Sequence, residues 1–268
     1  MGIDRRQFIK IAGLSTLFGL GGKAAWELLK PGQVEAALEA APLAAKRWAM
    51  VVDMRKMDDA TAQRCVEICH RIHNVPDFAQ PVNPADAVSP EEQIRWQVKW
   101  IWKDHFHNGF PGAEQQYMDE HVEHMPFLLL CNHCDNPPCV RVCPTQATFR
   151  RDDGVVMMDM HRCIGCRYCM AGCPFSARSF NWRDPRPYIK ETYPDYPTRE
   201  PGMVEKCDFC AKLLAKGKLP ACVEASKGAL VFGDLADEKS PVREALKANF
   251  TIRRKVYLGT NPQVYYIV

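Results

Sequence analysis

The sequence predicts an α+β fold of two interlocked, related modules that carry insertions. Three observations lead to this prediction. The 268 residues contain thirteen cysteines, these fall into closely spaced groups, and the groups repeat one another along the chain. Short apolar runs typical of strands lie beside the groups, as expected where each repeat is one small unit packed against its neighbour.

The strands are predicted from apolar runs bounded by turn residues. They are expected at 47–53, at 127–130, at 154–159 and in the tail over 256–266. One helix start is explicit, because Ser89 suits an N-cap, Pro90 the first helical position and Glu92 the third. This helix is predicted to run to about Asp104. Its apolar face would contain Ile94, Val98, Ile101 and Trp102.

The N-terminus has the layout of a twin-arginine (Tat) export signal. Arg5 and Arg6 are followed by Lys10 and by a mildly apolar run over 11–20, and residues 1–30 hold the whole net charge of +3. Cleavage is expected after Ala36 or Ala40, unless the segment stays as an anchor. Because the rest of the chain is neutral, we expect no nucleic-acid partner. No apolar run reaches the roughly 18 residues of a membrane-spanning helix.

The most specific group is Cys163, Cys166, Cys169 and Cys173 followed by Pro174, which is C-x2-C-x2-C-x3-C-P. This is the run of bacterial ferredoxins, in which three thiolates hold one cluster and the fourth ligates the other. Zinc typically uses two separated pairs of ligands. An odd cysteine count with such tight spacing also fits a disulfide framework poorly.

A second group repeats the first with two extra residues, as C-x2-C-x4-C-x3-C-P. Exchange of the fourth ligands then completes two sites. Site A would be held by Cys131, Cys134, Cys139 and Cys173. Site B would be held by Cys163, Cys166, Cys169 and Cys143.

The third group, Cys207, Cys210 and Cys222, has Ser226 where a fourth cysteine is expected. It must take its fourth ligand from elsewhere, and only Cys65 and Cys69 remain. Their spacing matches the last two cysteines of a run whose first two positions are now Asp59 and Ala62.

From about Trp48 to the C-terminus the chain resembles the iron–sulfur subunits of the DMSO-reductase type. The matching stretches surround Cys131, Cys163 and Cys207. In that family the first and last groups exchange ligands, which implies that Cys69 completes site C with Cys207, Cys210 and Cys222. The reciprocal site, at Asp59, Ala62, Cys65 and Ser226, would be lost. The resemblance thus implies three [4Fe-4S] clusters and leaves Cys65 as a small buried apolar side chain.

The expected domains follow from this pairing. Residues 1–40 are the signal, 127–181 a ferredoxin-like module with two clusters, and 47–75 plus 204–268 a second module with one. Residues 76–126 and 182–203 are insertions that cover the modules and dock partners.

The three-site pattern, the signal and the segment 65–76 together resemble the periplasmic ferredoxin-like subunits of DsrMKJOP-type membrane complexes. This resemblance implies a non-catalytic electron carrier, an NrfD-type quinone-interacting membrane subunit and a multihaem cytochrome c as partners, and no small-molecule substrate. Related subunits of polysulfide, hydrogenase or nitrite complexes are an alternative. So is a catalytic or sensing protein with an open iron at Cys207, Cys210 and Cys222, if Cys69 does not bind.

Other patterns are weaker. Cys65, Cys69 and His70 are spaced one residue too widely for c-type haem. The histidines at 105, 107, 121 and 124 are expected on a polar surface rather than on a metal, whereas His133 and His161 lie near cluster cysteines and could tune them or simply pack. Trp96, Trp100 and Trp102 are expected to pack the helix or to face a partner. No nucleophile–base pair, phosphate loop or nucleotide fingerprint is present.

Overall fold

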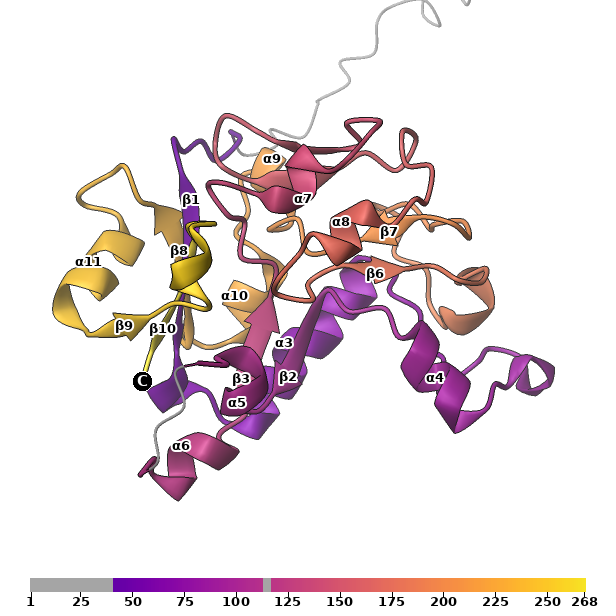
Figure 1. Cartoon of the computed structure of the whole chain (residues 1–268), viewed down its shortest axis with the longest axis horizontal. Helices are drawn as coiled ribbons and strands as arrows, with labels where there is room; N and C mark the ends of the chain where they lie inside the picture. Colours follow the sequence, from indigo (N-terminus) through magenta and orange to yellow (C-terminus); the bar gives the residue numbers. More distant parts are fainter. Residues whose placement is uncertain (1–40, 113–116) are drawn as a thin grey trace, which may run out of the picture. The chain divides into compact units, whose positions relative to one another are not determined.

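The beginning and the end of the described chain lie side by side in one mixed sheet (Figure 1). Its strand order is β8-β1-β10-β9, with β1 (Trp48–Asp53) parallel to β10 (Val264–Ile267) and antiparallel to β8 (Leu230–Asp234). The computed structural model describes residues 41–112 and 117–268, so the predicted signal over 1–40 lies outside the described residues. The predicted strand over 47–53 is confirmed.

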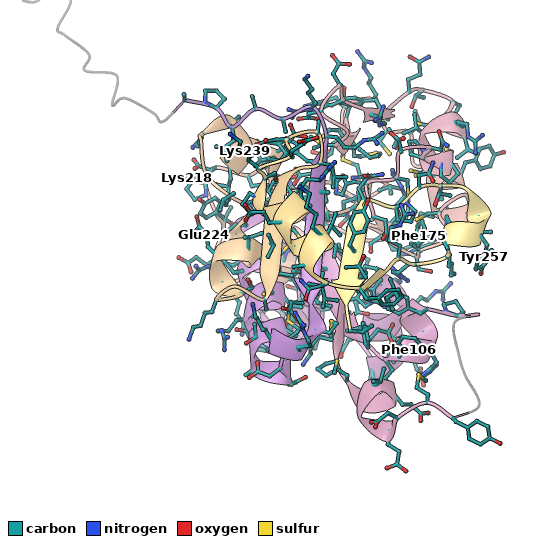
Figure 2. The ribbon with its side chains drawn as sticks, turned by 90° about the vertical axis from the view of Figure 1, so that its left-hand side faces the viewer. Phe106, Phe175, Lys218, Glu224, Lys239 and Tyr257 are labelled. Carbon is teal, nitrogen blue, oxygen red and sulfur yellow. The ribbon has the colours of Figure 1, made fainter. Side chains whose placement is uncertain are left out.

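Every residue of β1 is buried because both faces of its strand are covered. Trp48, Met50 and Val52 point to the main core, whereas Ala49 and Val51 pack under α11 (Pro241–Ala248). This alternation is the period of two that a strand imposes on its side chains. Figure 2 views the sheet from the side of α11 and labels Phe106, whose ring stacks on Phe110 in the main core.

The long helix α3 (Asp59–Ile72) begins at Asp58, whose carboxylate accepts a hydrogen bond of 2.7 Å from the Thr61 amide. Its buried positions include Ala62, Cys65 and Cys69, which share one helical face. This face packs against α10 (Ala221–Ala225), so the helix places the two early cysteines beside the third cysteine group.

The helix expected over 90–104 is shorter than predicted. The capping box at Ser89 is present, but α4 (Pro90–Trp96) ends at Trp96, and residues 101–104 form the strand β2 (Ile101–Asp104). This strand pairs antiparallel with β3 (Phe127–Leu130), and Ile94 is 78% exposed. Aromatic and β-branched residues favour a pleated surface, so the apolar run joins a strand instead of extending the helix.

Two small hairpins and two short helices surround the middle cysteine groups. β4 (Thr148–Arg150) pairs with β5 (Val156–Met158), and β6 (Ser179–Phe180) pairs with β7 (Val204–Glu205). The helices α7 and α8 are in contact with each other (Figure 1). Their bounds are Pro138–Arg141 and Tyr168–Ala171.

The remaining elements are short and connect these parts. The helices are α5 (Phe106–Gly109), α6 (Glu120–His124) and α9 (Ala211–Ala215). The 3-10 turns are η1 (Met54–Lys56), η2 (Pro84–Asp86), η3 (Arg186–Tyr188) and η4 (Val256–Leu258), and the last edge strand is β9 (Thr251–Ile252). In the described ranges, no helix combines the length and the apolar character needed to span a bilayer.

Candidate iron–sulfur centres

The four cysteines predicted for site A line one cavity. Cys131 and Cys134 come from the loop after β3, Cys139 from α7, and Cys173 from the segment after α8. The cavity is otherwise lined mainly by proline, Phe175 and aliphatic carbon. Phe175 is labelled in Figure 2. Four thiols around one space are the ligand set that cysteines supply to a [4Fe-4S] cluster.

The four cysteines predicted for site B line a second cavity. Cys163, Cys166 and Cys169 come from one loop and the start of α8, and Cys143 follows α7. Cys166 is exposed and only Cys169 is buried, so this cavity lies close to the protein surface. Each of the two middle groups therefore contributes three cysteines to one cavity and one to the other.

Cys69 lies among Cys207, Cys210 and Cys222. All four side chains are buried, with exposed fractions of 3–6%. Burial raises the pKa of the Cys69 thiol, and the neighbouring sulfurs of Cys207, Cys210 and Cys222 raise it further. The structure thus brings together the sequence-predicted residues of site C from α3, from the β7–α9 loop and from α10.

The three cysteine loops bend in the same way. The residue just before the second cysteine of each group has a left-handed backbone, with φ of 42° at His133, 68° at Gly165 and 54° at Phe209. Only glycine fits the second loop, because a Cβ on Gly165 would lie 2.4 Å from the carbonyl oxygen of Gly202. This turn directs the two flanking thiols of each loop to the same side.

The thiols need a compensating cation to become thiolates. Burial raises the pKa of Cys134 to about 12, with further contributions from the sulfurs of Cys131, Cys139 and Cys173. Four such thiols around one space lose their protons only if positive charge is bound between them, which is what iron supplies. The residues present therefore fit [4Fe-4S] clusters, which Cys thiolates hold in sets of four.

Polar groups that the sequence did not reveal surround these cavities. Arg178 is 5% exposed and lines cavity A. Next to site C, the ring nitrogen Nδ1 of His73 lies 2.8 Å from the Cys69 carbonyl oxygen, and its Nε2 lies 3.6 Å from the Asp208 carboxylate. No spacing rule marks Arg178, His73 or Asp208, because their contacts join segments far apart in sequence.

Two of the predicted auxiliary histidines are placed clearly. His133 is buried and accepts a hydrogen bond at Nδ1 from the Val156 amide. Burial lowers its pKa, and the charges of Lys206 and Arg178 lower it further, so the ring is neutral. His161 is exposed, and its amide donates to the Asp159 carboxylate. His133 therefore packs beside the cysteines, whereas His161 faces solvent.

The remaining predictions concern four histidines expected on the surface and the tryptophans expected on a helix. His105 and His107 are exposed and stack at 6.0 Å, whereas the side chains of His121 and His124 lie outside the described residues. Among the described residues no three His, Cys, Asp or Glu side chains form a site for a single metal ion. Trp100 and Trp102 pack in the core from β2 and its approach, not from a helix, so the helix-packing prediction is wrong for these two.

The four residues at the predicted lost site make ordinary contacts within the protein. Cys65 is fully buried, and its thiol donates to the Cys222 carbonyl oxygen at 3.4 Å. Ser226 donates to the Val223 carbonyl and accepts from the Leu230 amide. Asp59 faces outward and pairs with Lys103 at 2.7 Å, and Ala62 is buried against the core. The polar side chains at these positions thus have hydrogen-bond or ion-pair partners, and Ala62 packs in the core.

Comparison with known families gives the class of this protein. The 4Fe-4S dicluster domain family matches residues 122–186, the part that contains both middle cysteine groups. Together with the cysteine-lined cavities, this match defines a mixed helix-and-strand iron–sulfur protein with a ferredoxin-like dicluster domain.

Relatives extend the likeness over most of the chain. The chain is 39% identical to the Hdr-like menaquinol oxidoreductase iron-sulfur subunit 1 of Archaeoglobus fulgidus, over 82% of this chain and 83% of that protein. It is 35% identical to the menaquinone reductase iron-sulfur cluster-binding subunit of Nitratidesulfovibrio vulgaris, over 82% and 88%. With protein NrfC of Escherichia coli it shares 32% identity over 98% and 94%. The chain belongs to the iron–sulfur subunit family that contains these proteins, and the family prediction is confirmed.

Proposed function

We propose that this chain is a non-catalytic electron-transfer subunit that passes single electrons through three [4Fe-4S] clusters. The observation that carries the proposal is the series formed by the cysteine sets. Cys169 of site B neighbours Cys139 of site A, and Cys131 of site A neighbours Cys207 of site C. The clusters would therefore follow the order B, A, C. The four positions of the predicted lost site would follow C in this series. There α3 packs against α10 and no fourth cluster is proposed.

In this transfer the polypeptide would bind the clusters, keep water away from them and set their reduction potentials. Each [4Fe-4S] group supplies a one-electron couple whose potential depends on hydrogen bonds, charge and exposure. Apolar side chains keep solvent from sites A and C, and the Thr148 amide donates to the Cys143 sulfur at 3.5 Å. Such hydrogen bonds stabilise the more negative reduced state.

Site B is the end at which electrons would enter or leave. Cys166 is exposed there, and Ile164 and Tyr168 on the same loop are 68% and 63% exposed. An apolar rim around an accessible ligand suits a partner that must bring its own redox group close. Site C is deeply buried, so exchange with a partner at that end would require contact over α3 or the 182–203 insertion.

The partners and the compartment follow from the family and from the N-terminal segment. Two of the relatives are named as subunits of a menaquinol oxidoreductase and of a menaquinone reductase, which supports a quinone-linked membrane partner of the NrfD type. The twin-arginine segment supports export to the periplasm. The segment around Cys65 and Cys69 favours a DsrMKJOP-like complex of sulfur metabolism with a multihaem cytochrome c.

Two alternatives remain as competing proposals. The same subunit could serve a polysulfide, hydrogenase or nitrite complex, and isolation of the tagged chain from native membranes with identification of its cytochrome distinguishes these. A catalytic or sensing protein would instead keep an iron open at Cys207, Cys210 and Cys222. The position of Cys69 beside those sulfurs favours a closed, four-cysteine site.

Iron analysis with two cysteine variants tests the proposal. The intact protein should contain about twelve iron atoms, four for each cluster. Cys69→Ser should lose the cluster C signal in electron paramagnetic resonance (EPR) or convert it to a three-iron signal. Cys65→Ser is the matched control on the same helical face and should keep all iron. About sixteen irons in the intact protein, or unchanged spectra in Cys69→Ser, would overturn the assignment.

A further inference from the structure

A buried arginine lies between cavities A and B. The Arg178 guanidinium lines cavity A, and its nearest sulfurs are those of Cys139 and Cys131 from site A and of Cys169 from site B. Burial alone would lower the pKa of Arg178, but those three sulfurs raise it as thiolates. No carboxylate pairs with Arg178 within the described part of the chain. Its charge therefore faces the two sets of sulfurs.

The hydrogen bonds of Arg178 link it to the ligands of both sites. Its Nη1 donates to the Thr148 hydroxyl at 3.1 Å, and the Thr148 amide in turn donates to the Cys143 sulfur of site B. Its Nη2 is buried and has no hydrogen-bond partner among the described residues. The sulfurs of Cys139 and Cys169 are the acceptors that lie nearest to this guanidinium, so one cationic donor serves a ligand of each site.

The cysteine repeat explains how the arginine reaches this place. Arg178 stands five residues after Cys173, and Thr148 stands five residues after Cys143, so the two are equivalent positions in the two groups. The repeat brings equivalent positions together, and here they meet in a hydrogen bond. One position carries the cation, and the other supplies a neutral hydroxyl that holds it.

We propose that Arg178 is the shared counter-charge of clusters A and B, which raises the reduction potentials of both. The proposal rests on the proposed function. A [4Fe-4S] group with four thiolates has a net charge of −2 when oxidised and −3 when reduced. An electron that passes between A and B moves this extra charge from one side of Arg178 to the other. No proton is needed, because an arginine stays charged throughout.

Cluster C would have charged groups of both signs beside it. The buried Asp208 carboxylate lies near Cys210, Cys69 and Cys207. A neighbouring anion disfavours the more negative reduced state, whereas a neighbouring cation favours it, and low dielectric strengthens both effects. The buried Lys206 ammonium also lies there, bound by the carbonyl oxygens of Val156 and Cys207, and neutral carbonyl partners do not cancel its charge.

EPR-monitored redox titration of the full-length protein tests the proposal with Arg178→Gln and Arg178→Lys. The control is Arg243→Gln on α11, where the arginine binds the Leu235 carbonyl. In Arg178→Gln the equilibrium constants for reduction of clusters A and B should fall at least about tenfold. This lowers each reduction potential by at least about 59 mV, because the couple transfers one electron. Cluster C and the control should not move. Arg178→Lys should restore at least half of the shift.

Every outcome decides the proposal. A glutamine variant with full iron and unchanged potentials, or with all three clusters shifted equally, overturns it. If Arg178→Gln loses clusters A and B, recovery of both in Arg178→Lys supports a required counter-charge, and their absence there shows a packing role and overturns it. The iron content of the wild-type protein is measured first. A wild-type count other than about twelve irons would reject the proposed function itself, separately from the role of Arg178.

Discussion

The imidazole of His133 stacks on the phenyl ring of Phe209, with the ring centroids 3.6 Å apart and the planes inclined by 20°. The two residues hold the same position in two different cysteine loops, just before the second cysteine, and both have a left-handed backbone. The stack therefore joins the loop of site A to the loop of site C. Phe209 also packs edge-on against Phe232 of the main sheet, at 5.2 Å.

Truncation of this ring should destabilise the protein. Phe209 is 1% exposed, and loss of a buried phenyl ring costs about 3–5 kcal/mol because a cavity remains. Phe209→Ala is expected to lower the thermal unfolding midpoint of the cluster-loaded protein strongly. Phe250→Ala, at a ring that is 79% exposed, is the control and should stay within about 0.5 kcal/mol. Equal effects from the two variants would refute a structural role for the stack.

Both predicted insertions are attached to β7 through one carboxylate. Glu205 of β7 accepts hydrogen bonds from Trp100 Nε1, Asn181 Nδ2 and Arg199 Nη2. Trp100 belongs to the 76–126 insertion and Arg199 to the 182–203 insertion, and the Glu205 and Arg199 side chains are both fully buried. This buried pair thus holds two surface segments that are distant in sequence.

Glu205→Gln should release these insertions. The variant leaves a buried guanidinium without its carboxylate, which typically costs about 3–5 kcal/mol, and its amide N–H would meet a donor. We expect a lower unfolding midpoint and faster proteolysis within 182–203. Asp184→Asn breaks an ion pair on the surface and should change neither quantity measurably. Resistance to protease equal to that of wild type would contradict this anchoring role.

The cysteine sets could be predicted from the sequence because their spacing is local and each thiol is chemically distinctive. Exchange of fourth ligands places Cys173 beside Cys131 and Cys143 beside Cys163, and the cavities contain these combinations. The strand over 127–130 was predictable from its apolar run. Its partner over 101–104 was not, because the choice between helix and strand there depends on pairing with β3.

The polar surroundings of the sites could not be predicted, for a related reason. Arg178 and Glu205 carry no local signature, and each acquires its role only when segments of the chain meet. A buried charge in a sequence looks the same as an exposed one. Its partners follow from the three-dimensional arrangement of the loops, which spacing alone does not give.

Ser226 should be a structural residue of a site that no longer binds iron. Its hydroxyl accepts from the Leu230 amide at 2.9 Å, and this amide is buried. Ser226→Ala leaves the amide without an acceptor and is expected to cost about 1–3 kcal/mol in unfolding free energy. Ser226→Cys nearly keeps the side-chain volume, and its iron content should stay at the wild-type value, because Asp59 and Ala62 of helix α3 supply no thiol. A gain of about four irons would contradict the loss of this site.

The three proposed clusters should be lost in a fixed order when the protein is treated with an oxidant and a chelator. Cys166 is exposed and Cys143 and Cys163 are half-buried, whereas the cysteines of site C are all buried. Access of solvent and oxidant to the sulfurs therefore falls from B to C, and thiolate exposure controls oxidation. A time course with ferricyanide and EDTA, followed by EPR, should show the B signal disappearing first and the C signal last. The Cys69→Ser variant identifies the C signal in these spectra. Loss of C before B would contradict the accessibility that the structure assigns, since iron would then be leaving through the most buried set of thiols.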